Sequence, residues 1–243
     1  MKTLIIVQAR MNSERLPGKV LKKVLGKPLL KYEIERLKRV RSAGGVLVAT
    51  GDDGSNDAIA DFCRAEKVTF FRGPEEDVLS RFYGAAKEHS AETIVRVCAD
   101  SPLVDPAVTE KTLRHFQKNP GRFDYVSNVL RRTYPRGLDC EVFSFKALEE
   151  AHREAREKSE REHVTPFIYN HPERYRLGGV ENDTDESRYR WTVDTAEDFE
   201  LIRAILTELY PLKPDFEMAD VLKLYAKHPE WRKINEHVRQ KAV

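Results

Sequence analysis

A short apolar run at residues 4–7, L-I-I-V, constrains the fold more than any other feature of the chain. A run of this kind without polar alternation is typical of a strand that is buried on both faces of a parallel sheet. Three cations follow it at fixed offsets, Arg10, Arg15 and Lys19, together with Ser13 and a Pro-Gly pair. Ligands of open α/β sheets bind outside the carboxyl ends of the strands, and Arg and Lys neutralise phosphate oxygens. The stretch therefore indicates a polyphosphate-binding loop, with an ordinary basic surface loop as the alternative.

The composition argues against nucleic-acid and membrane partners. Hydrophobic residues make up 40% of the 243 residues, which is enough for a sizeable core, and the net charge of +2 gives no bulk attraction for nucleic acid. No apolar run approaches the ~20 residues of a membrane span, and no signal-peptide pattern precedes the first strand. Cys63, Cys98 and Cys140 are widely spaced without a C-x-x-C pair, which favours reduced thiols. We therefore expect a cytoplasmic protein.

Strand-like and helix-like segments alternate through the first half of the chain. Strands are expected at residues 46–50, 68–71 and 93–99, with apolar residues at helical spacing between them and after Pro106. This alternation predicts an α/β fold with a doubly wound, mostly parallel sheet and right-handed crossovers. No G-x-G-x-x-G and no G-x-x-x-x-G-K-[ST] occurs, which argues against a Rossmann dinucleotide site and a Walker P-loop.

From Asp124 onward the alternation ends. The elements expected there are strands at 125–126, 141–143 and 189–193, a charged helical stretch at 145–170, and two short helices within 215–243. Pro166 is expected to break the helical stretch, and Pro229 to separate the last two helices.

Two aspartates are expected where two strands end, Asp100 after residues 93–99 and Asp194 after residues 189–193. Both would then face the crevice that contains the basic loop. Carboxylates beside a polyphosphate site suit Mg²⁺, which proteins bind through one or two carboxylates plus substrate phosphates. Each aspartate could also be an ordinary helix cap. As a pair that completes a cationic loop, they indicate a Mg²⁺ site.

Other polar residues leave more than one interpretation open. His163 lies in a charged helical context with no Ser or Cys nucleophile beside it, where a structural role is the simpler interpretation. Glu141 is isolated in a predicted strand, where it would orient a polar substrate or pair with Arg136. Arg131, Arg132 and Arg136 would together suit an anion.

Several motifs occur in a fixed order along residues 3–207: A-R-M-N-S-E-R-L-P-G-K followed by G-K-P-L-L, V-L-V-A-T-G-D-D, V-C-A-D-S-P-L-V and W-T-V-D-T-A-E-D-F. In this order they resemble the cytidylyltransferases that make CMP-KDO and CMP-sialic acid. The segments Y-P-R-G-L-D-C-E-V-F and E-R-E-H-V-T-P are most similar to the branch typified by spore coat polysaccharide biosynthesis protein F.

The resemblance implies a three-layer, Rossmann-like nucleotidyltransferase fold that forms a single domain, residues 1–243, with a smaller α+β insertion. About residues 129–190 would form the acceptor-binding and dimerisation subregion, since family members are usually homodimers. The implied reaction transfers CMP from CTP to an acidic sugar or similar anionic acceptor and releases pyrophosphate, for surface polysaccharide or glycoconjugate biosynthesis. Mg²⁺ would be the cofactor.

The resemblance also implies roles for individual residues. Arg10, Arg15 and Lys19 would hold the triphosphate and stabilise charge in the transition state, while Asp100 and Asp194 would hold Mg²⁺. In-line attack of the acceptor oxygen on the α-phosphorus needs no protein nucleophile. The residues expected to contact the nucleotide are Ala9, Arg10, Ser13, Arg15, Lys19, Thr50, Asp52, Asp77, Arg81 and Asp100. Those expected in the acceptor site are Arg136, Asp139, Glu141 and His163.

The motifs also depart from the family pattern and leave alternatives open. The block C-A-D-S-P stands where the KDO enzymes show a Gly-Asp-Glu-Pro type of sequence, and the acceptor-side segments match neither the KDO nor the sialic acid pattern closely. The acceptors left open are an eight- or nine-carbon acidic sugar and a smaller phosphorylated or phosphonate compound. A glycosyltransferase that consumes a nucleotide sugar would need an Asp-x-Asp motif, of which D-S-P supplies one carboxylate. A non-catalytic nucleotide-binding protein would be expected to lack Arg15, Lys19 or Asp100, and all three are present.

Overall fold

The computed structural model describes residues 2–240 of the chain. Its centre is a seven-stranded sheet with the strand order β5-β4-β1-β6-β8-β7-β9. Strand β1 (Thr3–Gln8) pairs in parallel with β4 (Val46–Gly51) on one side and with β6 (Thr93–Cys98) on the other, and β5 (Thr69–Gly73) pairs in parallel with β4. The predicted strand 4–7 is therefore a central strand, and the four strands expected before residue 100 are all present.

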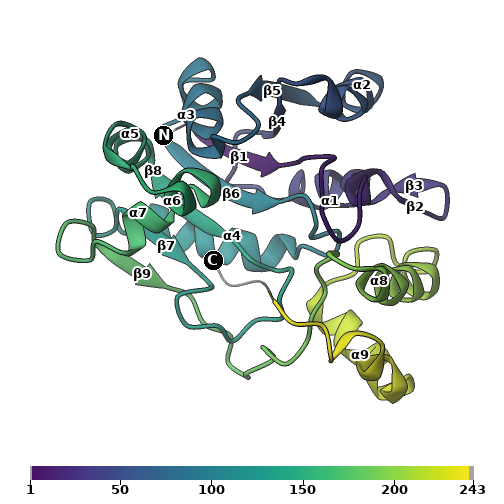
Figure 1. Cartoon of the computed structure of the whole chain (residues 1–243). Helices are drawn as coiled ribbons and strands as arrows, with labels where there is room; N and C mark the ends of the chain where they lie inside the picture. The colour runs from purple at the N-terminus through teal and green to yellow at the C-terminus, as the bar shows by residue number, and fades with distance from the viewer. Residues whose placement is uncertain (1, 241–243) are drawn as a thin grey trace.

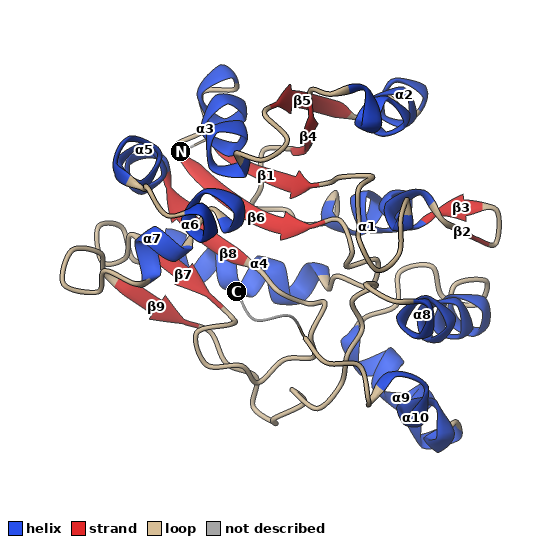
Figure 2. Ribbon diagram, in the orientation of Figure 1, coloured by secondary structure: helices blue, strands red, loops and turns tan. Residues whose placement is uncertain are grey.

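The other part of the sheet is mixed. Strand β8 (Glu141–Ser144) runs antiparallel to β6 and to β7 (Tyr125–Ser127), and β9 (Leu177–Gly179) pairs in parallel with β7. A separate two-stranded sheet is formed by β2 (Lys23–Val24) and β3 (Lys27–Pro28). Figure 2 shows the strands of the main sheet side by side, with β9 at one edge and β5 at the other.

Helices cover both faces of the sheet, which gives the expected three layers (Figure 1). Successive residues of a strand point to opposite faces, so Ile6 packs in one apolar cluster and Ile5 in another. On the Ile6 face lie α3 (Val78–Glu88), α5 (Phe145–Glu154), α6 (Lys158–His163) and α7 (Pro166–Tyr169). On the Ile5 face lie α1 (Leu29–Leu37), α2 (Asp57–Ala65) and α4 (Pro106–Gln117). The predicted Rossmann-like α/β fold is thus confirmed.

A third apolar cluster lies beyond the sheet, around Trp191 and Phe216. Its helices are α8 (Ala196–Leu209), α9 (Met218–Lys227) and α10 (Arg232–Asn235), with a 3₁₀ turn at Pro229–Trp231. The two C-terminal helices separated at Pro229 are as expected, and the last three residues of the predicted segment lie outside the described residues. No helix among residues 2–240 is long and apolar enough to cross a bilayer. The three cysteines are unpaired, as expected.

Two predicted elements differ from the structure. The stretch 145–170 is broken not only before Pro166 but also between α5 and α6. The strand expected at residues 189–193 is absent, and the segment makes only an isolated bridge between Arg136 and Arg190. Its backbone donors bond to two different segments, since the Trp191 N–H donates to the carbonyl oxygen of Arg136 and the Val193 N–H to that of Asp100. Without one continuous partner strand, no ladder forms.

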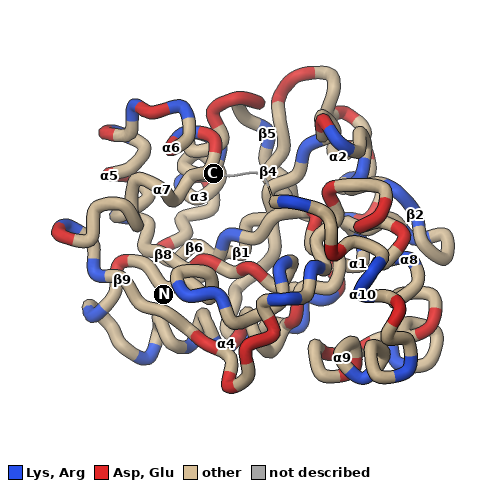
Figure 3. Tube along the Cα trace, turned by 60° about the horizontal axis from the view of Figure 1, so that its bottom comes forward, with Lys and Arg blue, Asp and Glu red and all other residues tan. Residues whose placement is uncertain are grey.

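Charge is spread over the molecule. In the view of Figure 3, Lys and Arg lie among Asp and Glu along the trace rather than on one face. This distribution agrees with the net charge of +2. A cationic site in this molecule is therefore local.

Gly137 provides a test of the packing between its turn and the segment that leads to Asp194. Its φ of +103° is strained for other residues, and an added Cβ would lie 2.6 Å from the backbone nitrogen of Thr192. We expect Gly137→Ala to lower the free energy of unfolding by about 2–4 kcal/mol, because backbone strain and a clash with rigid backbone add together. Urea denaturation measures this loss.

Gly179→Ala is the matched control, because nothing lies within 4 Å of a Cβ added there. It should change the free energy of unfolding by less than about 1 kcal/mol. Equal losses for the two variants would contradict the packing described for Gly137.

Candidate active site

A cleft of about 900 Å³ opens at the carboxyl ends of β1 and β6. This volume lies at the upper end of the range common for small-molecule sites. The predicted site residues that line the cleft are Arg10, Ser13, Arg15, Lys19, Asp100, Arg136, Asp139, Glu141, His163 and Asp194. The structure therefore brings together most of the residues that the sequence proposed for nucleotide, metal and acceptor.

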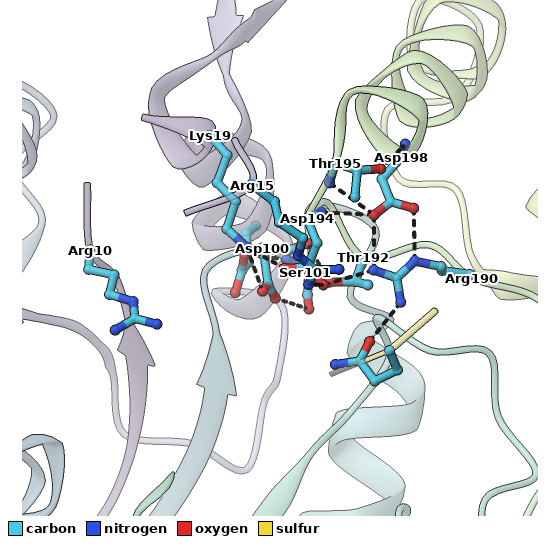
Figure 4. Close-up of polar contacts among 12 residues, drawn as sticks. Arg10, Arg15, Lys19, Asp100, Ser101, Arg190, Thr192, Asp194, Thr195 and Asp198 are labelled. Atoms are coloured by element: carbon cyan, nitrogen blue, oxygen red, sulfur yellow. Dashed lines mark hydrogen bonds and ion pairs between the residues drawn. The ribbon is translucent and has the colours of Figure 1, made fainter. Parts of the chain in front are cut away.

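Lys19 lies between the two predicted metal ligands (Figure 4). Its Nζ donates to Asp100 Oδ2 at 2.9 Å and to Asp194 Oδ1 at 2.7 Å. Burial alone would lower the pKa of Lys19, but the two carboxylates outweigh this effect and raise the pKa above 10.5. The ammonium group is therefore charged. It joins the loop that contains Lys19 to two segments that lie 81 and 175 residues further along the chain.

Asp194 has two further cationic partners. Its Oδ2 is 3.0 Å from Nη2 of Arg15 and 2.8 Å from Nη2 of Arg190. Burial works to raise the pKa of Asp194, and Lys19 and Arg15 more than offset this, so that the pKa is lowered. Asp194 is consequently ionised in the free chain.

Arg190 is held by Asp198, a fully buried carboxylate at the start of α8. The Asp198 oxygens accept bonds from Nε and Nη2 of Arg190 at 2.8 and 2.9 Å and from the backbone N–H groups of Asp194 and Thr195. Sequence reasoning missed both Arg190 and Asp198. The available signal was T-x-x-D, the capping box that Thr195 and Asp198 form at the N-terminus of α8.

Asp100 is held by backbone and hydroxyl contacts. The Val193 N–H and the Thr192 hydroxyl donate to its carbonyl oxygen, and the Ser101 hydroxyl donates to Oδ1 at 3.2 Å. Behind it lies Glu33, which is fully buried and accepts a bond from the Ser101 N–H at 3.3 Å. Burial, followed by the charge of Asp100, raises the pKa of Glu33 well above its usual value.

Asp100 and Asp194 fit a divalent cation. Both carboxylates line the cleft and both reach the same Nζ, while the caps of α4 and α8 are instead Asp105 and Thr195. The alternative interpretation of the two aspartates as helix caps is therefore wrong. No group of three or more His, Cys, Asp or Glu suited to a metal occurs within residues 2–240. The chain would thus supply two carboxylates, and phosphate and water oxygens would complete the shell, as is common for Mg²⁺.

Arg10 lies apart from the Lys19 contacts in Figure 4. Its guanidinium is partly exposed and 3.8 Å from Glu162, next to His163 in the same cleft. Burial, followed by the positive charges of Arg96 and Arg10, lowers the pKa of His163 below its ordinary value despite the attraction of Glu162. His163 is therefore a neutral hydrogen-bonding group at pH 7.

Glu141 does not pair with Arg136, and that prediction is wrong. Glu141 lies directly opposite Arg96 in the antiparallel register of β6 and β8, and the two side chains form an ion pair. Its Oε1 also accepts bonds from the Tyr125 hydroxyl at 2.7 Å and the Thr165 hydroxyl at 2.6 Å. The sequence predicted the strand that contains Glu141 but not the strand beside it. Arg96 and the hydroxyls of Tyr125 and Thr165 were therefore not predicted as partners of Glu141.

Among the residues that the structure describes, Arg136 is the arginine of the cleft that has no carboxylate partner. Arg132 binds Asp139 in a bidentate pair at 2.6 and 2.8 Å, whereas Arg136 forms no ion pair with any residue that the structure describes. Burial and the nearby Arg132 lower its pKa. Arg136 is thus the positive group of this part of the cleft that is available to an anion.

Five predicted nucleotide contacts do not line the cleft: Ala9, Thr50, Asp52, Asp77 and Arg81. Asp77 caps α3 and pairs with Arg161 at 2.6 Å, and Arg81 is fully buried beside Glu75. The structure therefore gives Asp77 and Arg81 structural partners in the free chain. A contact of any of the five with a nucleotide stays a prediction.

Comparison with known proteins agrees with the family that the motifs resemble. A family model described as cytidylyltransferase matches residues 4–225. The uncharacterized protein MJ1063 of Methanocaldococcus jannaschii is 38% identical, over 100% of this chain and 98% of its own length. The spore coat polysaccharide biosynthesis protein SpsF of Bacillus subtilis is 32% identical, over 93% of this chain and 95% of its own length.

Solved structures show the same relationship. A cytidylyltransferase from Leptospira borgpetersenii superposes with a TM-score of 0.91 at 31% identity, over 100% of both chains. A CMP:2-keto-3-deoxy-manno-octonic acid synthetase, solved in complex with CTP, shares the fold, with a TM-score of 0.65 at 19% identity over 86% of this chain and 99% of that one. The expected family is confirmed by the sequence model, the relatives and the first of these structures. This chain belongs to the cytidylyltransferase family.

Proposed function

We propose that this chain is a Mg²⁺-dependent enzyme that transfers CMP from CTP to an acidic sugar or similar anionic acceptor and releases pyrophosphate. Its product would serve surface polysaccharide or glycoconjugate biosynthesis. The observation that carries the proposal is the bridge of Lys19 between Asp100 and Asp194, in one cleft with Arg10, Arg15 and Arg136. Membership of the cytidylyltransferase family, with SpsF among its relatives, supports the reaction class and the pathway.

The charges in the cleft suit an exchange of partners when a triphosphate binds. In the free chain, Lys19 and Arg15 balance the charge of Asp194. Phosphate oxygens would accept hydrogen bonds from these cations in place of the carboxylates. Mg²⁺, held by Asp100 and Asp194, would neutralise negative charge on the phosphates. Every charged group in the site would then keep a partner of opposite sign.

The residues of the cleft favour direct transfer. The acceptor oxygen would form a bond to the α-phosphorus while the bond to the pyrophosphate oxygen breaks, and Arg10, Arg15 and Lys19 would stabilise the developing charge. Cys98 lines the cleft, but burial raises the pKa of its thiol to about 12, so it is protonated near neutral pH. A covalent intermediate on this sulfur is therefore not part of the proposal.

The acceptor would bind at the part of the cleft that contains Arg136, Asp139 and His163. Arg96 and Arg132 already bind Glu141 and Asp139, so Arg136 would receive the anionic group of the acceptor. Neutral His163 would bond to a hydroxyl. A homodimer through residues 129–190 and a cytoplasmic location stay predictions.

Pyrophosphate release tests the reaction. We expect release only with CTP, Mg²⁺ and one acceptor from a panel of KDO, sialic acids, pseudaminic-type sugars, small phosphates and phosphonates, with the other nucleoside triphosphates run alongside. Asp100→Ala should reduce kcat/KM by about 100-fold or more, because it removes one of two proposed metal carboxylates.

Arg136→Ala separates acceptor binding from nucleotide binding in the same assay. It should raise the KM for the acceptor about tenfold or more and leave the KM for CTP within about twofold. Equal effects on both constants would contradict the acceptor site. Absence of CTP binding by the wild-type chain would contradict the transferase itself.

His163 reports on triphosphate binding at Arg10. Because burial and two arginines lower its pKa, its NMR titration midpoint should lie below 6.5 in the free chain. The fold thus favours the neutral ring. This contribution to stability is fully present above the unfolded pKa and is lost as the pH falls through the lower pKa of the folded chain. CTP should raise the midpoint, because phosphate oxygens would offset the charge of Arg10.

His163→Asn assigns the resonance. His152, which stacks on Tyr83 and does not line the cleft, serves as the control whose midpoint should not respond to CTP. A His163 midpoint that CTP leaves unchanged would contradict triphosphate binding at Arg10. A midpoint above 6.5 in the free chain would contradict the effect of burial and the two arginines on this ring.

A further inference from the structure

The last described residues, 236–240, lead from α10 to the cleft. After α10 the chain, yellow in Figure 1, runs from the helices of the third cluster toward the middle of the sheet. The Val238 N–H donates to the carbonyl oxygen of Asn235 at 3.0 Å, and Gln240 lines the cleft. The C-terminal segment is thus part of the wall of the candidate active site.

Its contacts converge on the residues that surround Asp194. Gln240 Oε1 accepts a bond from Nη1 of Arg190 at 2.7 Å, and the carbonyl oxygen of Arg239 accepts one from Nη1 of Arg15 at 3.4 Å. At the base of the segment, the buried Asn235 amide donates to the carbonyl oxygen of Arg190 at 3.0 Å and to Asp198 Oδ1 at 2.8 Å.

Gln240 completes the hydrogen bonding of Arg190. The Nε and Nη2 groups of this guanidinium bind Asp198 and Asp194, which leaves Nη1 for Gln240. The Arg190 side chain is only 9% exposed. An unpaired donor on a charged group in such a place is costly. Without Gln240, the orientation of the guanidinium would depend on Asp198 and Asp194 alone.

We propose that Gln240 is a positioning residue that acts through Arg190 to fix the orientation of the Asp194 carboxylate. The proposal rests on the proposed function, in which Asp194 holds Mg²⁺ beside the triphosphate. Partners in the outer shell of a metal site orient the ligands of the inner shell and alter metal affinity. Gln240 contacts neither the phosphates nor the metal in this scheme. A phosphate oxygen would replace the carbonyl oxygen of Arg239 as the acceptor of the longer hydrogen bond from Arg15.

Calorimetric binding of CTP with Mg²⁺ in the absence of acceptor tests the proposal without turnover. Gln240→Ala should raise Kd about three- to tenfold, because Gln240 is one step further from the metal than an ordinary outer-shell partner. The KM for the acceptor should stay within about twofold of the wild type. Gln240→Glu keeps an oxygen acceptor for Arg190 and should restore Kd.

Glu236→Gln is the matched control and should bind like the wild type. Glu236 is an exposed residue of the same segment, and its side chain forms no hydrogen bond or ion pair with any residue described. Thermal unfolding confirms that each variant is folded. Wild-type affinity in Gln240→Ala, no rescue by Gln240→Glu, or an equal rise in acceptor KM would overturn the inference.

A chain shortened after Asn235 separates positioning from inhibition. Weaker binding of CTP with Mg²⁺ supports positioning. Tighter binding would overturn it and make the segment a competitor of the triphosphate. If the wild-type chain itself binds no CTP with Mg²⁺, the proposed function fails; if it binds and Gln240→Ala matches it, only this inference fails.

Discussion

The ion pairs of Lys19 with Asp100 and Asp194 are the interaction on which the site depends. They join the loop after β1, the end of β6 and the segment before α8, three parts of the chain that share no strand ladder at this point. Removing one partner from a buried ion pair is strongly destabilising because the other charge is left unpaired. Here the side chains are 11–23% exposed, so water moderates that cost. The site is thus assembled before any ligand binds, with its charges balanced internally.

The parallel part and the mixed part of the sheet supply different residues to the proposed site. The parallel strands β1 and β6 end at the cleft and place Arg10, Lys19 and Asp100 there, as the geometry of parallel strands requires. The antiparallel strand β8 lies beside β6 and supplies Glu141 opposite Arg96. One cleft therefore has a cation–carboxylate cluster at the parallel strands and a second set of polar groups at the mixed part of the sheet.

Residues that follow a strand closely were predictable from the sequence, because the carboxyl ends of neighbouring parallel strands meet in space. Asp100 and Arg10 are of this kind, each two residues after the end of its strand. Asp194 also reaches the cleft, but the strand expected before it is absent; hydrogen bonds to Asp100 and Arg136 hold that segment instead. The partner of Glu141 depended on strand register, and the contact of Gln240 with Arg190 spans 50 residues without any local pattern. Asp77 and Arg81 follow a strand in sequence, yet capping and burial give them structural partners.

Metal binding without nucleotide is the most direct test of the central claim that Lys19 occupies the two carboxylates until a triphosphate binds Lys19 and a metal ion takes its place on the carboxylates. Free Mn²⁺, counted by its EPR signal, would be titrated with the wild-type chain, Lys19→Met, and Lys27→Met as a control that breaks an ion pair outside the cleft. Lys19→Met should bind one Mn²⁺ about tenfold or more tightly than the wild type, because two carboxylates lose their shared cation. The double variant Lys19→Met/Asp100→Ala should lose that gain. Equal affinity of the wild type and Lys19→Met would contradict the account.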